Sequence, residues 1–391
     1  MTKTYKYRLY PNKKTKRELN KTLNSCRETY NYILNIKNSK YEKDKTHLSK
    51  YDVDKIITQY KKEKEELKLI HSQILQNVSD RADKAYKNFF RRIKKGDKPG
   101  FPRFKGINRY DSFTLPQNNG SFKIIDDKWL QISKIGKIKI NLHREIEGKI
   151  KSCIIKKTKT HKWYAYFISE CDLNILPTNN KKVGIDVGIK TFAYCSDDNV
   201  VKNPRILKHS EKKLKKYQSK FSKQPKRSEK RKKYGKILTK IHEKIKNQRE
   251  NFLHQESRKI VNKYQIICME DLTIKSMIKK DKTKDNLEQY KDRLRNKNIL
   301  DACWDKFINN IIYKAEEAGR TISLVDPRYT SQMCSRCGHL VPKELNDRIH
   351  RCDKCGLVMD RDKNSSITIL RLGLESLEVM LLRSPRIYSG E

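Results

Sequence analysis

Four cysteines near the C-terminus have the spacing of a zinc ribbon. They form two Cys-x2-Cys pairs, Cys334/Cys337 and Cys352/Cys355, separated by residues 338–351, and such pairs bind one tetrahedral ion from two tight turns. Two disulfides are the alternative, but the chain opens without a secretory signal pattern that would direct it to an oxidising compartment. We therefore predict one structural Zn²⁺ with four sulfur ligands, which leaves that ion no open position for catalysis.

Three carboxylates lie on elements that are far apart in the sequence. Asp186 lies within a predicted strand, Glu270 ends a later strand, and Asp362 opens the helix after the cysteines. Phosphodiester cleavage can use two Mg²⁺ ions about 3.5–4 Å apart, and such ions prefer carboxylate oxygens. Each acid also has a structural alternative: Asp186 could close a turn, Glu270 could end its strand, and Asp362 or Asp360 could cap the helix. The spacing alone leaves both interpretations open.

The charge balance indicates a polyanionic partner. The 391 residues include 91 Lys and Arg against 46 Asp and Glu, a formal net charge of +45. Such self-repulsion destabilises a compact chain unless a polyanion neutralises it, and nucleic acid releases counterions when it binds Lys and Arg. No apolar run approaches the roughly 18–20 residues of a membrane-spanning helix. Disorder is disfavoured because 20 Tyr, 11 Phe and patterned aliphatic residues can form a core. We predict a nucleic-acid-binding protein without membrane association.

The first half of the chain predicts a β-barrel that contains a helical insertion. Residues 1–10 alternate polar with apolar side chains, as a half-buried strand does. Apolar residues at helical spacing follow, until Gly and Pro mark a basic loop over 94–105. From 113 to 169, short alternating segments with polar turns are typical of a small barrel. Because the first strand stands apart from these segments, the helices are predicted to interrupt the barrel.

The second half alternates strands with helices, which predicts a mixed α/β sheet. Residues 211–235 carry twelve Lys and Arg against two Glu, so a basic helical hairpin is predicted there to contact nucleic acid rather than only to present a solvated face. Residues 275–298 are predicted to be a charged, mobile segment. The other expected elements are strands within 183–194, 264–270 and 321–325, and helices over 299–318 and 364–382.

Three segments contain the candidate acids: Gly184-Ile-Asp186-Val-Gly188-Ile-Lys190, Met269-Glu270-Asp271-Leu272 and Asp360-Arg361-Asp362-Lys363-Asn364-Ser-Ser. They resemble the three RuvC motifs of the TnpB family of transposon-encoded RNA-guided nucleases, which are regarded as ancestors of the compact type V CRISPR effectors. Ser365 and Ser366 stand where that family usually has two alanines. Further family-like segments, at 5–11, 85–91, 98–104, 251–254 and 299–304, extend the resemblance over nearly the whole chain.

The resemblance implies a multidomain α+β fold. An N-terminal wedge β-barrel would comprise 1–10 and 108–180, and a helical recognition insertion would comprise 11–107. An RNase H-like (RuvC) α/β nuclease domain would comprise 181–327 and 360–391, with a zinc ribbon inserted at 328–359 that contacts target nucleic acid.

The resemblance also implies site residues. Asp186, Glu270 and Asp362 match the catalytic Mg²⁺ ligands of the family, and Asp362 is preferred to Asp360 because it precedes Asn364 by two residues, as in the family. A helix that contains Gln73, Gln76 and Asn77 corresponds to a segment that reads a short DNA motif beside the target. Glutamine can pair with adenine through two hydrogen bonds, although a surface helix could carry these side chains for solubility alone.

The implied activity is RNA-guided cleavage of double-stranded DNA next to a short flanking motif, with two catalytic Mg²⁺ and one structural Zn²⁺. The partners would be a guide RNA and the DNA target, and the location the cytoplasm of a prokaryote, at the nucleoid when DNA is bound. One alternative is a compact type V CRISPR effector with the same chemistry. Another is a guided DNA-binding repressor that does not cut.

Overall fold

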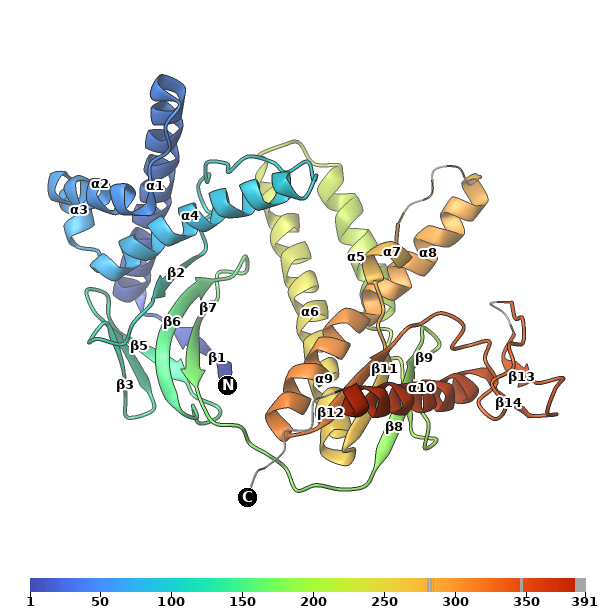
Figure 1. The fold of residues 1–391 in the computed structure, drawn as a ribbon. Coiled ribbons are helices and arrows are strands. Elements are labelled where there is room, and N and C mark those ends of the chain that lie inside the picture. The colour runs from blue at the N-terminus through green and yellow to red at the C-terminus, as the bar shows by residue number, and fades with distance from the viewer. Residues whose placement is uncertain (280, 282, 284, 345–346, 384–391) are drawn as a thin grey trace, which may run out of the picture. The chain divides into compact units, whose positions relative to one another are not determined.

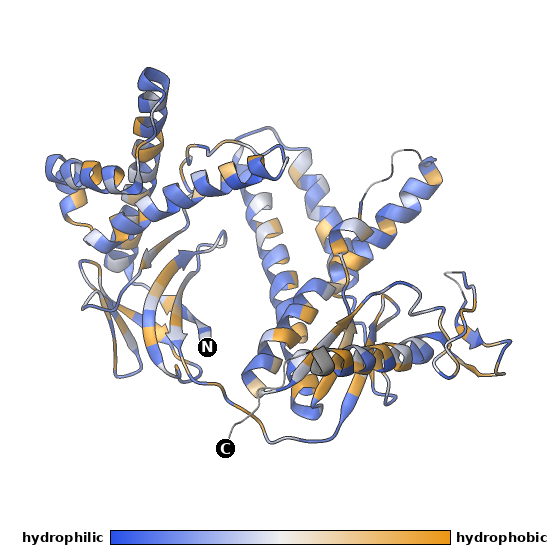
Figure 2. Ribbon diagram, viewed as in Figure 1, coloured by the Kyte–Doolittle hydropathy of each residue, from blue (hydrophilic) through white to orange (hydrophobic). Residues whose placement is uncertain are grey.

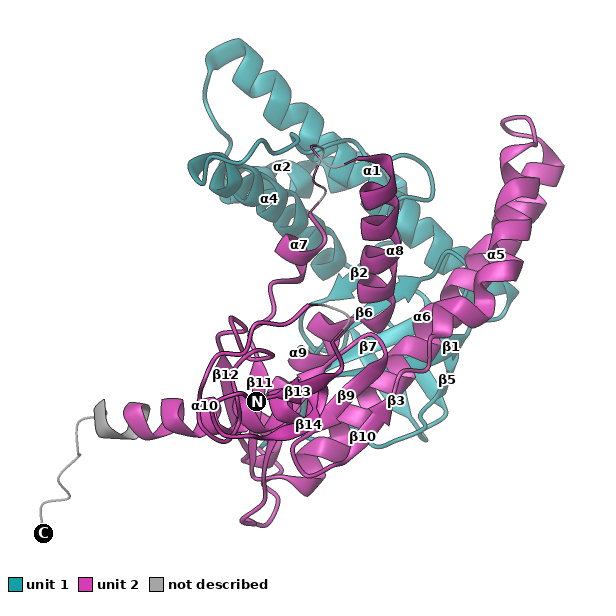
Figure 3. Cartoon of the chain, turned by 90° about the vertical axis from the view of Figure 1, so that its right-hand side faces the viewer, with its two compact units in different colours: residues 1–172 teal, residues 173–391 magenta. Residues whose placement is uncertain are grey.

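The chain forms two units, residues 1–172 and 173–391, each with its own core (Figure 3). The computed structural model describes residues 1–279, 281, 283, 285–344 and 347–383, and the side chains only to residue 379. The predicted nuclease range 360–391, ribbon 328–359 and segment 275–298 therefore each include residues outside the described part. Residues 173–180, assigned to the barrel in the sequence analysis, fall in the second unit, where the Leu176 N–H donates to the Ala318 carbonyl.

The first unit is built on a seven-stranded antiparallel sheet in the order β2-β6-β7-β1-β5-β4-β3. β1 occupies the middle of the sheet although it is far from the other strands in sequence, as predicted. The sheet curls (Figure 1), but within the described residues no pairing joins its edge strands β2 and β3, so it is not a barrel closed by hydrogen bonds. The strands are β1 (Thr2–Tyr10), β2 (Ser112–Leu115), β3 (Phe122–Ile125), β4 (Trp129–Ile132), β5 (Gly136–Asn141), β6 (Lys149–Lys157) and β7 (Trp163–Glu170).

Helices between β1 and β2 form the predicted insertion and share one core with the sheet. The first begins where the Asn12 side chain accepts from the Thr15 N–H, and the second begins with a capping box between Ser49 and Asp52. Their apolar residues recur at helical spacing and are buried, which explains why the pattern was readable in the sequence. The helices are α1 (Lys13–Asp44), α2 (Lys50–Glu63), α3 (Glu65–Lys68) and α4 (Ser72–Lys94).

The second unit contains a five-stranded mixed sheet in the order β10-β9-β8-β11-β12. The first three strands in sequence pair antiparallel, whereas β11 runs parallel to both β8 and β12. The predicted mixed α/β sheet is therefore present. Its strands are β8 (Lys182–Val187), β9 (Thr191–Cys195), β10 (Val200–Lys202), β11 (Ile266–Glu270) and β12 (Thr321–Val325).

Helices pack on both faces of this sheet. Ile185 and Met269 belong to the core formed with α6 and α9, while Cys268 and Val325 pack with Ile369 of α10 on the opposite face. The basic hairpin is present as α5 and α6, and hydrophilic residues predominate along these helices (Figure 2). The helices are α5 (Ile206–Ser222), α6 (Glu229–Lys263), α7 (Ile274–Met277), α8 (Asn286–Ala302), α9 (Trp304–Ala318) and α10 (Arg361–Arg383).

The second half of the segment 275–298 forms most of α8, a helix that the sequence analysis did not predict, and the mobility of the segment stays a prediction. This helix buries only Ile299 and Ala302, so it lacks the apolar periodicity that marks a helix in a sequence. It begins instead with a side-chain cap, in which Asp285 accepts from the Glu288 N–H at 2.7 Å. The predicted helix over 299–318 is divided at Cys303, whose φ of 57° separates α8 from α9.

Two glycines allow α10 to lie directly on the sheet (Figure 1). A Cβ atom at Gly184 would lie 2.0 Å from the Ser366 carbonyl oxygen, and one at Gly373 would lie 2.4 Å from the Cys268 sulfur. At Gly184 the obstructing atoms are backbone, so they cannot move away without shifting the helix. We expect Gly184→Ala to lower the free energy of unfolding by at least about 1–3 kcal/mol, measured by urea denaturation.

The matched control is Gly235→Ala in α6, where a Cβ would meet only the edge of the Phe221 ring at 3.3 Å. Alanine is favoured over glycine inside a helix by about 1 kcal/mol, so this variant should be at least as stable as the parent. Equal stability of Gly184→Ala and the parent would contradict the close packing of α10.

A buried lysine joins α9 to α6 and gives the fold a pH dependence. The Lys314 ammonium, on a residue that is 4% exposed, donates to the His254 carbonyl oxygen and the Ser257 hydroxyl, each at 2.7 Å. Burial, and then the neighbouring Arg258 charge, lower the pKa of Lys314 to about 8. An unfolded lysine has a pKa of about 10.4, so between these values the unfolded chain binds more protons and stability rises with pH.

Lys314→Met is therefore expected to remove part of the stability that the parent gains between about pH 8 and pH 10. Urea unfolding of parent and variant at both pH values measures the difference. Lys259→Met is the control, because that side chain is 71% exposed and pairs only with Glu256 in the described structure. An unchanged pH gain in Lys314→Met would show that this lysine is not the group responsible.

Candidate active site and metal centre

Asp186 and Glu270 lie side by side at the carboxyl ends of adjacent parallel strands. The register pairs Ile185 of β8 with Met269 of β11, and the two acids are the next residue along each strand. Neighbouring strands are about 4.8 Å apart, and residues in register point to the same face. The paired positions two residues earlier, Gly184 and Cys268, both face α10, so both acids also face this helix.

Asp362 reaches the same place from α10. The Ser366 carbonyl of α10 lies over Gly184 of β8. Asp362 is about one helical turn before Ser366 on α10, and Asp186 is two residues after Gly184 on β8. Since residues four apart lie on one helix face, this geometry brings Asp362 over Asp186. In agreement, Glu270 and Asp362 are the two carboxylates that most strongly raise the pKa of Asp186.

The electrostatics of Asp186 and Glu270 are unfavourable without a cation. Burial is the largest cause of the raised pKa of Asp186, followed by the charges of Glu270 and Asp362. Burial also raises the pKa of Glu270, which is 9% exposed. Buried carboxylates that repel one another are frequent at functional sites, because a cation or proton can relieve the repulsion.

Asp360 and Asp362 have different partners, although they are only two residues apart. The Asp360 carboxylate accepts from the backbone N–H groups of Asp362 at 2.8 Å and Lys363 at 3.1 Å, so it caps α10. The Asp362 carboxylate instead pairs with the Arg361 guanidinium, at 3.2 Å between Nη2 and Oδ1. The predicted capping role thus falls to Asp360, while Asp362 lies close enough to Asp186 for its charge to raise the pKa of that acid.

Thr330 is a site residue that sequence reasoning missed. Its hydroxyl, fully buried, donates to Oε1 of Glu270 at 2.5 Å and also lies 3.1 Å from the Pro327 carbonyl. This bond orients the Glu270 side chain and opposes the rise in its pKa. Thr330 precedes the cysteines in a segment without helix or strand periodicity, so no sequence pattern could have placed it beside Glu270.

The four predicted cysteines come together in the ribbon. Their sulfur atoms all lie within 4.8 Å of one another, with 3.6 Å between Cys334 and Cys355 and 3.5 Å between Cys337 and Cys352. Two short strands, β13 (Ile349–Arg351) and β14 (Val358–Asp360), support the second pair. Among the described residues, these four cysteines are the only group of three or more potential metal ligands whose ligand atoms lie this close together. Glu270 and Asp362 are instead linked to Asp186 through the effect of their charges on its pKa.

The turns around the sulfurs favour a thiolate at Cys334 and at Cys352. Gly338 and Gly356 have φ of 76° and 70°, and their N–H groups donate to the Cys334 and Cys352 carbonyls, which closes each Cys-x2-Cys turn. Burial opposes ionisation of Cys334, but backbone N–H groups and neighbouring thiols outweigh it and lower its pKa to about 7. The pKa of Cys355 rises to about 12 despite a hydrogen bond from Leu357, because burial and the other sulfurs favour its protonated form. A set of four sulfurs that shares protons in this way is suited to a soft divalent ion.

Asn364 connects the ribbon to α10. Its side chain accepts from the Ser335 N–H at 2.9 Å and donates to the Met333 carbonyl at 2.7 Å, and the residue is fully buried. Because Asn364 is two residues after Asp362, the first cysteine turn and the candidate acid are held by the same helical turn.

The three predicted DNA-reading residues lie on α4 of the first unit. Gln76 is exposed, whereas Gln73 donates to Gln117 of the β2–β3 loop at 3.4 Å. Asn77 accepts from Arg81, which in turn bonds to the start of β2. Gln76 is therefore the one of the three whose side chain has no hydrogen bond to the described part of the protein, and the DNA-reading role stays a prediction.

No helix of the described chain is long and apolar enough to cross a bilayer.

The fold and site define a basic, two-unit α+β protein with a four-cysteine ribbon beside an acid-bearing sheet edge. Three family profiles match parts of this chain. They are described as "Helix-turn-helix domain" over residues 1–46, "Probable transposase" over 170–281 and "Cas12f1-like, TNB domain" over 304–369.

Known proteins resemble this chain over most of its length. "Putative RNA-guided DNA endonuclease InsQ" of Escherichia coli (strain K12) is 27% identical over 378 residues, which cover 94% of this chain and 92% of the relative. "TnpB-like protein MJ0751" of Methanocaldococcus jannaschii is 31% identical over 214 residues, 51% of this chain and 71% of the relative. The chain belongs to the TnpB family, as its motifs predicted.

A solved structure shares the fold. The mini-RNA-guided endonuclease CRISPR-Cas phi3 superposes with a TM-score of 0.52 at 9% identity, and the match covers 96% of this chain and 92% of that chain. At this identity the likeness concerns the α+β fold alone.

Proposed function

We propose that this chain is an RNA-guided DNA endonuclease that cuts target DNA next to a short flanking motif. The observation that carries the proposal is the convergence of Asp186, Glu270 and Asp362 from two strands and one helix at a single sheet edge. Membership of the TnpB family, with a relative named as an RNA-guided DNA endonuclease over almost the full length, supports the same activity.

The finer fold assignments belong to this proposal. Three antiparallel strands followed by two parallel ones, in the order β10-β9-β8-β11-β12, support an RNase H-like (RuvC) domain with the ribbon inserted before α10. The curled sheet with its helical insertion supports a wedge and recognition region in the first unit. The segment over 275–298 would then cover the acids until a guide duplex forms.

The donor sets fit the expected metals. Three hard carboxylates suit a pair of Mg²⁺ ions, and four sulfurs within 4.8 Å suit one structural Zn²⁺. Bound Mg²⁺ would supply an activated water and neutralise charge on the phosphate and the leaving oxygen.

The protein's own groups then have separate tasks. Asp186, Glu270 and Asp362 would hold the Mg²⁺ pair, while Thr330 fixes the orientation of Glu270 through its hydrogen bond.

Target choice would rest on pairing between a guide RNA and one DNA strand. In such systems the protein contacts the heteroduplex through shape and backbone and reads only a short flanking motif itself. The net charge of +45 supports a long nucleic-acid surface. Gln73, Gln76 and Asn77 would read the flanking motif, and the complex would work in the cytoplasm, at the nucleoid when bound to DNA.

A compact type V CRISPR effector is the second candidate, favoured by the match of residues 304–369 to a Cas12f1-like domain. The chemistry would be the same, but the guide would come from a repeat array. A CRISPR array beside the gene would support this candidate, whereas a transposon end that overlaps the RNA gene would support the first.

The test is cleavage of a plasmid by the protein purified with its native RNA. Sequencing of the copurified RNA should reveal one species with a variable end, and a plasmid matching that end should be linearised in Mg²⁺. Absence of a discrete RNA would overturn guided targeting. Occupancy of the target without cuts would indicate a guided repressor, and joined DNA products would indicate strand transfer.

A further inference from the structure

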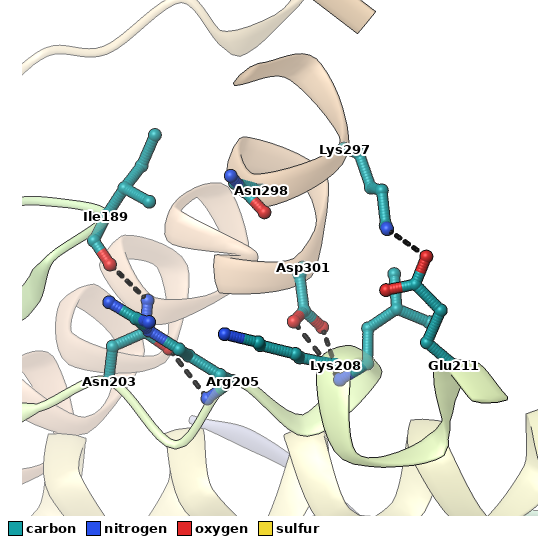
Figure 4. Close-up of a pocket in the computed structure, with 9 residues that line it drawn as sticks. Ile189, Asn203, Arg205, Lys208, Glu211, Lys297, Asn298 and Asp301 are labelled. Atoms are coloured by element: carbon teal, nitrogen blue, oxygen red, sulfur yellow. Dashed lines mark hydrogen bonds and ion pairs between the residues drawn. The ribbon is translucent and has the colours of Figure 1, made fainter. Parts of the chain in front are cut away.

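A pocket of about 310 Å³ lies between the β8–β9 turn, the start of α5 and the end of α8 (Figure 4). A cavity needs only about 10–15 Å³ by this measure to hold one water, so the pocket has room for a group as large as a phosphate. The pocket is lined by Ile189, Asn203, Arg205, Leu207, Lys208, Glu211, Lys297, Asn298 and Asp301.

The acids of the pocket are already neutralised by protein groups. Asp301 accepts from the Arg249 guanidinium at 2.8 Å and from the Leu207 N–H at 3.1 Å. Glu211 pairs with Lys297 at 2.6 Å and with Lys215 at 3.0 Å. A cation would therefore find no available carboxylate among the described residues of the lining.

Two cations of the pocket have no acidic partner within the described residues: Arg205 and Lys208. Both are exposed, and Figure 4 shows their side chains extended in the same direction, into the space below Ile189 and Asn298. Arg205 has the left-handed backbone φ of 42°, held by a bond from its N–H to the Asn203 side chain at 2.9 Å. A strained arginine beside an unpaired lysine gives the pocket the charge and donors that suit a phosphate.

The pocket lies at the edge of the sheet that carries the acids. Ile189 follows Asp186 by three residues, so their Cα atoms are no more than about 11 Å apart. Ligands of open α/β sheets bind outside the carboxyl ends of the strands, and β8 ends at Val187.

We propose that this pocket binds a backbone phosphate of the DNA strand that enters the carboxylate site, with Arg205 and Lys208 as its phosphate ligands. The proposal rests on the proposed nuclease function and makes the pocket its positioning subsite, one or a few nucleotides from the cut. The guide RNA has the same phosphate chemistry, but the place of the pocket at the carboxyl end of β8, the strand that carries Asp186, favours the strand that is cut.

The first test measures binding of single-stranded DNA of about 12 nucleotides, within the range of known site sizes, by fluorescence anisotropy without divalent cations. The full chain is compared with Arg205→Asn/Lys208→Gln, because asparagine tolerates the left-handed backbone at position 205. We expect roughly tenfold weaker binding, and a salt slope smaller by about 0.7, since one single-strand phosphate contact contributes about that much.

The control is Lys213→Gln/Lys216→Gln, which removes the same charge from α5 outside the pocket lining. It should weaken binding less than the pocket variant, and both variants should melt like the parent. Equal losses in the two variants would overturn the pocket and leave only a general charge effect. A protein that binds through the pocket but never cuts would refute the nuclease function alone.

The second test identifies the phosphate. In the RNA-loaded complex, single phosphates of the DNA strand are replaced in turn by uncharged methylphosphonates. Replacement of one phosphate near the cut should weaken binding to the parent. The same replacement should have no further effect on binding to the pocket variant, because that variant already lacks the contact. If no DNA position shows this coupling, or if a guide-RNA position shows it instead, the assignment to the DNA strand is wrong.

Discussion

Asp186→Asn is expected to abolish DNA cleavage and, at the same time, to stabilise the metal-free protein. The catalytic Mg²⁺ ions are expected to stabilise the transition state by several kcal/mol. Loss of one of their ligands should therefore lower the rate of cleavage roughly a thousandfold or more. The neutral amide also removes the repulsion that, after burial, raises the pKa of Asp186. A folded-state pKa above the unfolded value means that ionisation destabilises the fold as pH rises toward neutrality, so the variant should melt at a higher temperature near pH 7.

Plasmid cleavage and thermal melting, with and without Mg²⁺, measure the two effects. Mg²⁺ should raise the melting temperature of the parent more than that of the variant, since only the parent has the full ligand set. A variant that cuts normally would refute the assignment of Asp186. A variant that is destabilised as well as inactive would indicate a structural acid instead.

The neighbouring aspartates offer a matched pair for the third ligand. Asp362→Asn should remove cleavage, whereas Asp360→Asn should preserve it, because asparagine also caps a helix well and the Asp360 carboxylate already accepts two backbone N–H groups. The reverse result would make Asp360 the metal ligand.

The sequence could place Asp186 and Glu270 near the ends of their strands, and the cysteines in two turns, because these signals are local; the role of the acids came from the family resemblance and stays a prediction. Two buried strands that each carry an acid near their end bring those acids together wherever the strands pair in parallel, as Asp186 and Glu270 do. The two Cys-x2-Cys turns likewise need only the glycines that follow them. In both cases the pattern that indicates the structure lies within a single strand or a single turn.

Contacts between distant segments could not be predicted in this way. Thr330 bonds to a residue 60 positions earlier, and its own segment has no periodicity. α8 was missed because Leu287, Tyr290 and Leu294 are exposed, at 61%, 55% and 44%, so burial does not shape its pattern. Whether the N-terminal sheet closes is also invisible, because closure depends on two edge strands meeting.

If the ribbon holds the proposed zinc, its loss is expected to slow the proposed cleavage strongly, even though four sulfur ligands leave that ion no open position for the reaction. The ribbon core consists mainly of Cys334, Cys352 and Leu357, too little apolar surface to fold alone, so metal binding must supply most of its folding free energy. Without it, Thr330 would no longer hold Glu270, and Asn364 would no longer fix the turn that carries Asp362. Losses of such supporting contacts typically cost about 10–100-fold each.

Cys352→Ser should therefore contain no zinc by metal analysis and show at least about a hundredfold slower cutting in saturating Mg²⁺. Cys303→Ser is the control, since Cys303 lies outside the sulfur cluster and is also partly exposed, and it should retain both zinc and activity. Asn364→Ala separates the two effects: it keeps all four sulfurs, so zinc should stay bound while cutting slows. A zinc-free variant that cuts like the parent would show that the ribbon and the acids are independent, whereas a slow Asn364→Ala with full zinc would place the coupling in the hydrogen bonds from Asn364 to Ser335 and Met333.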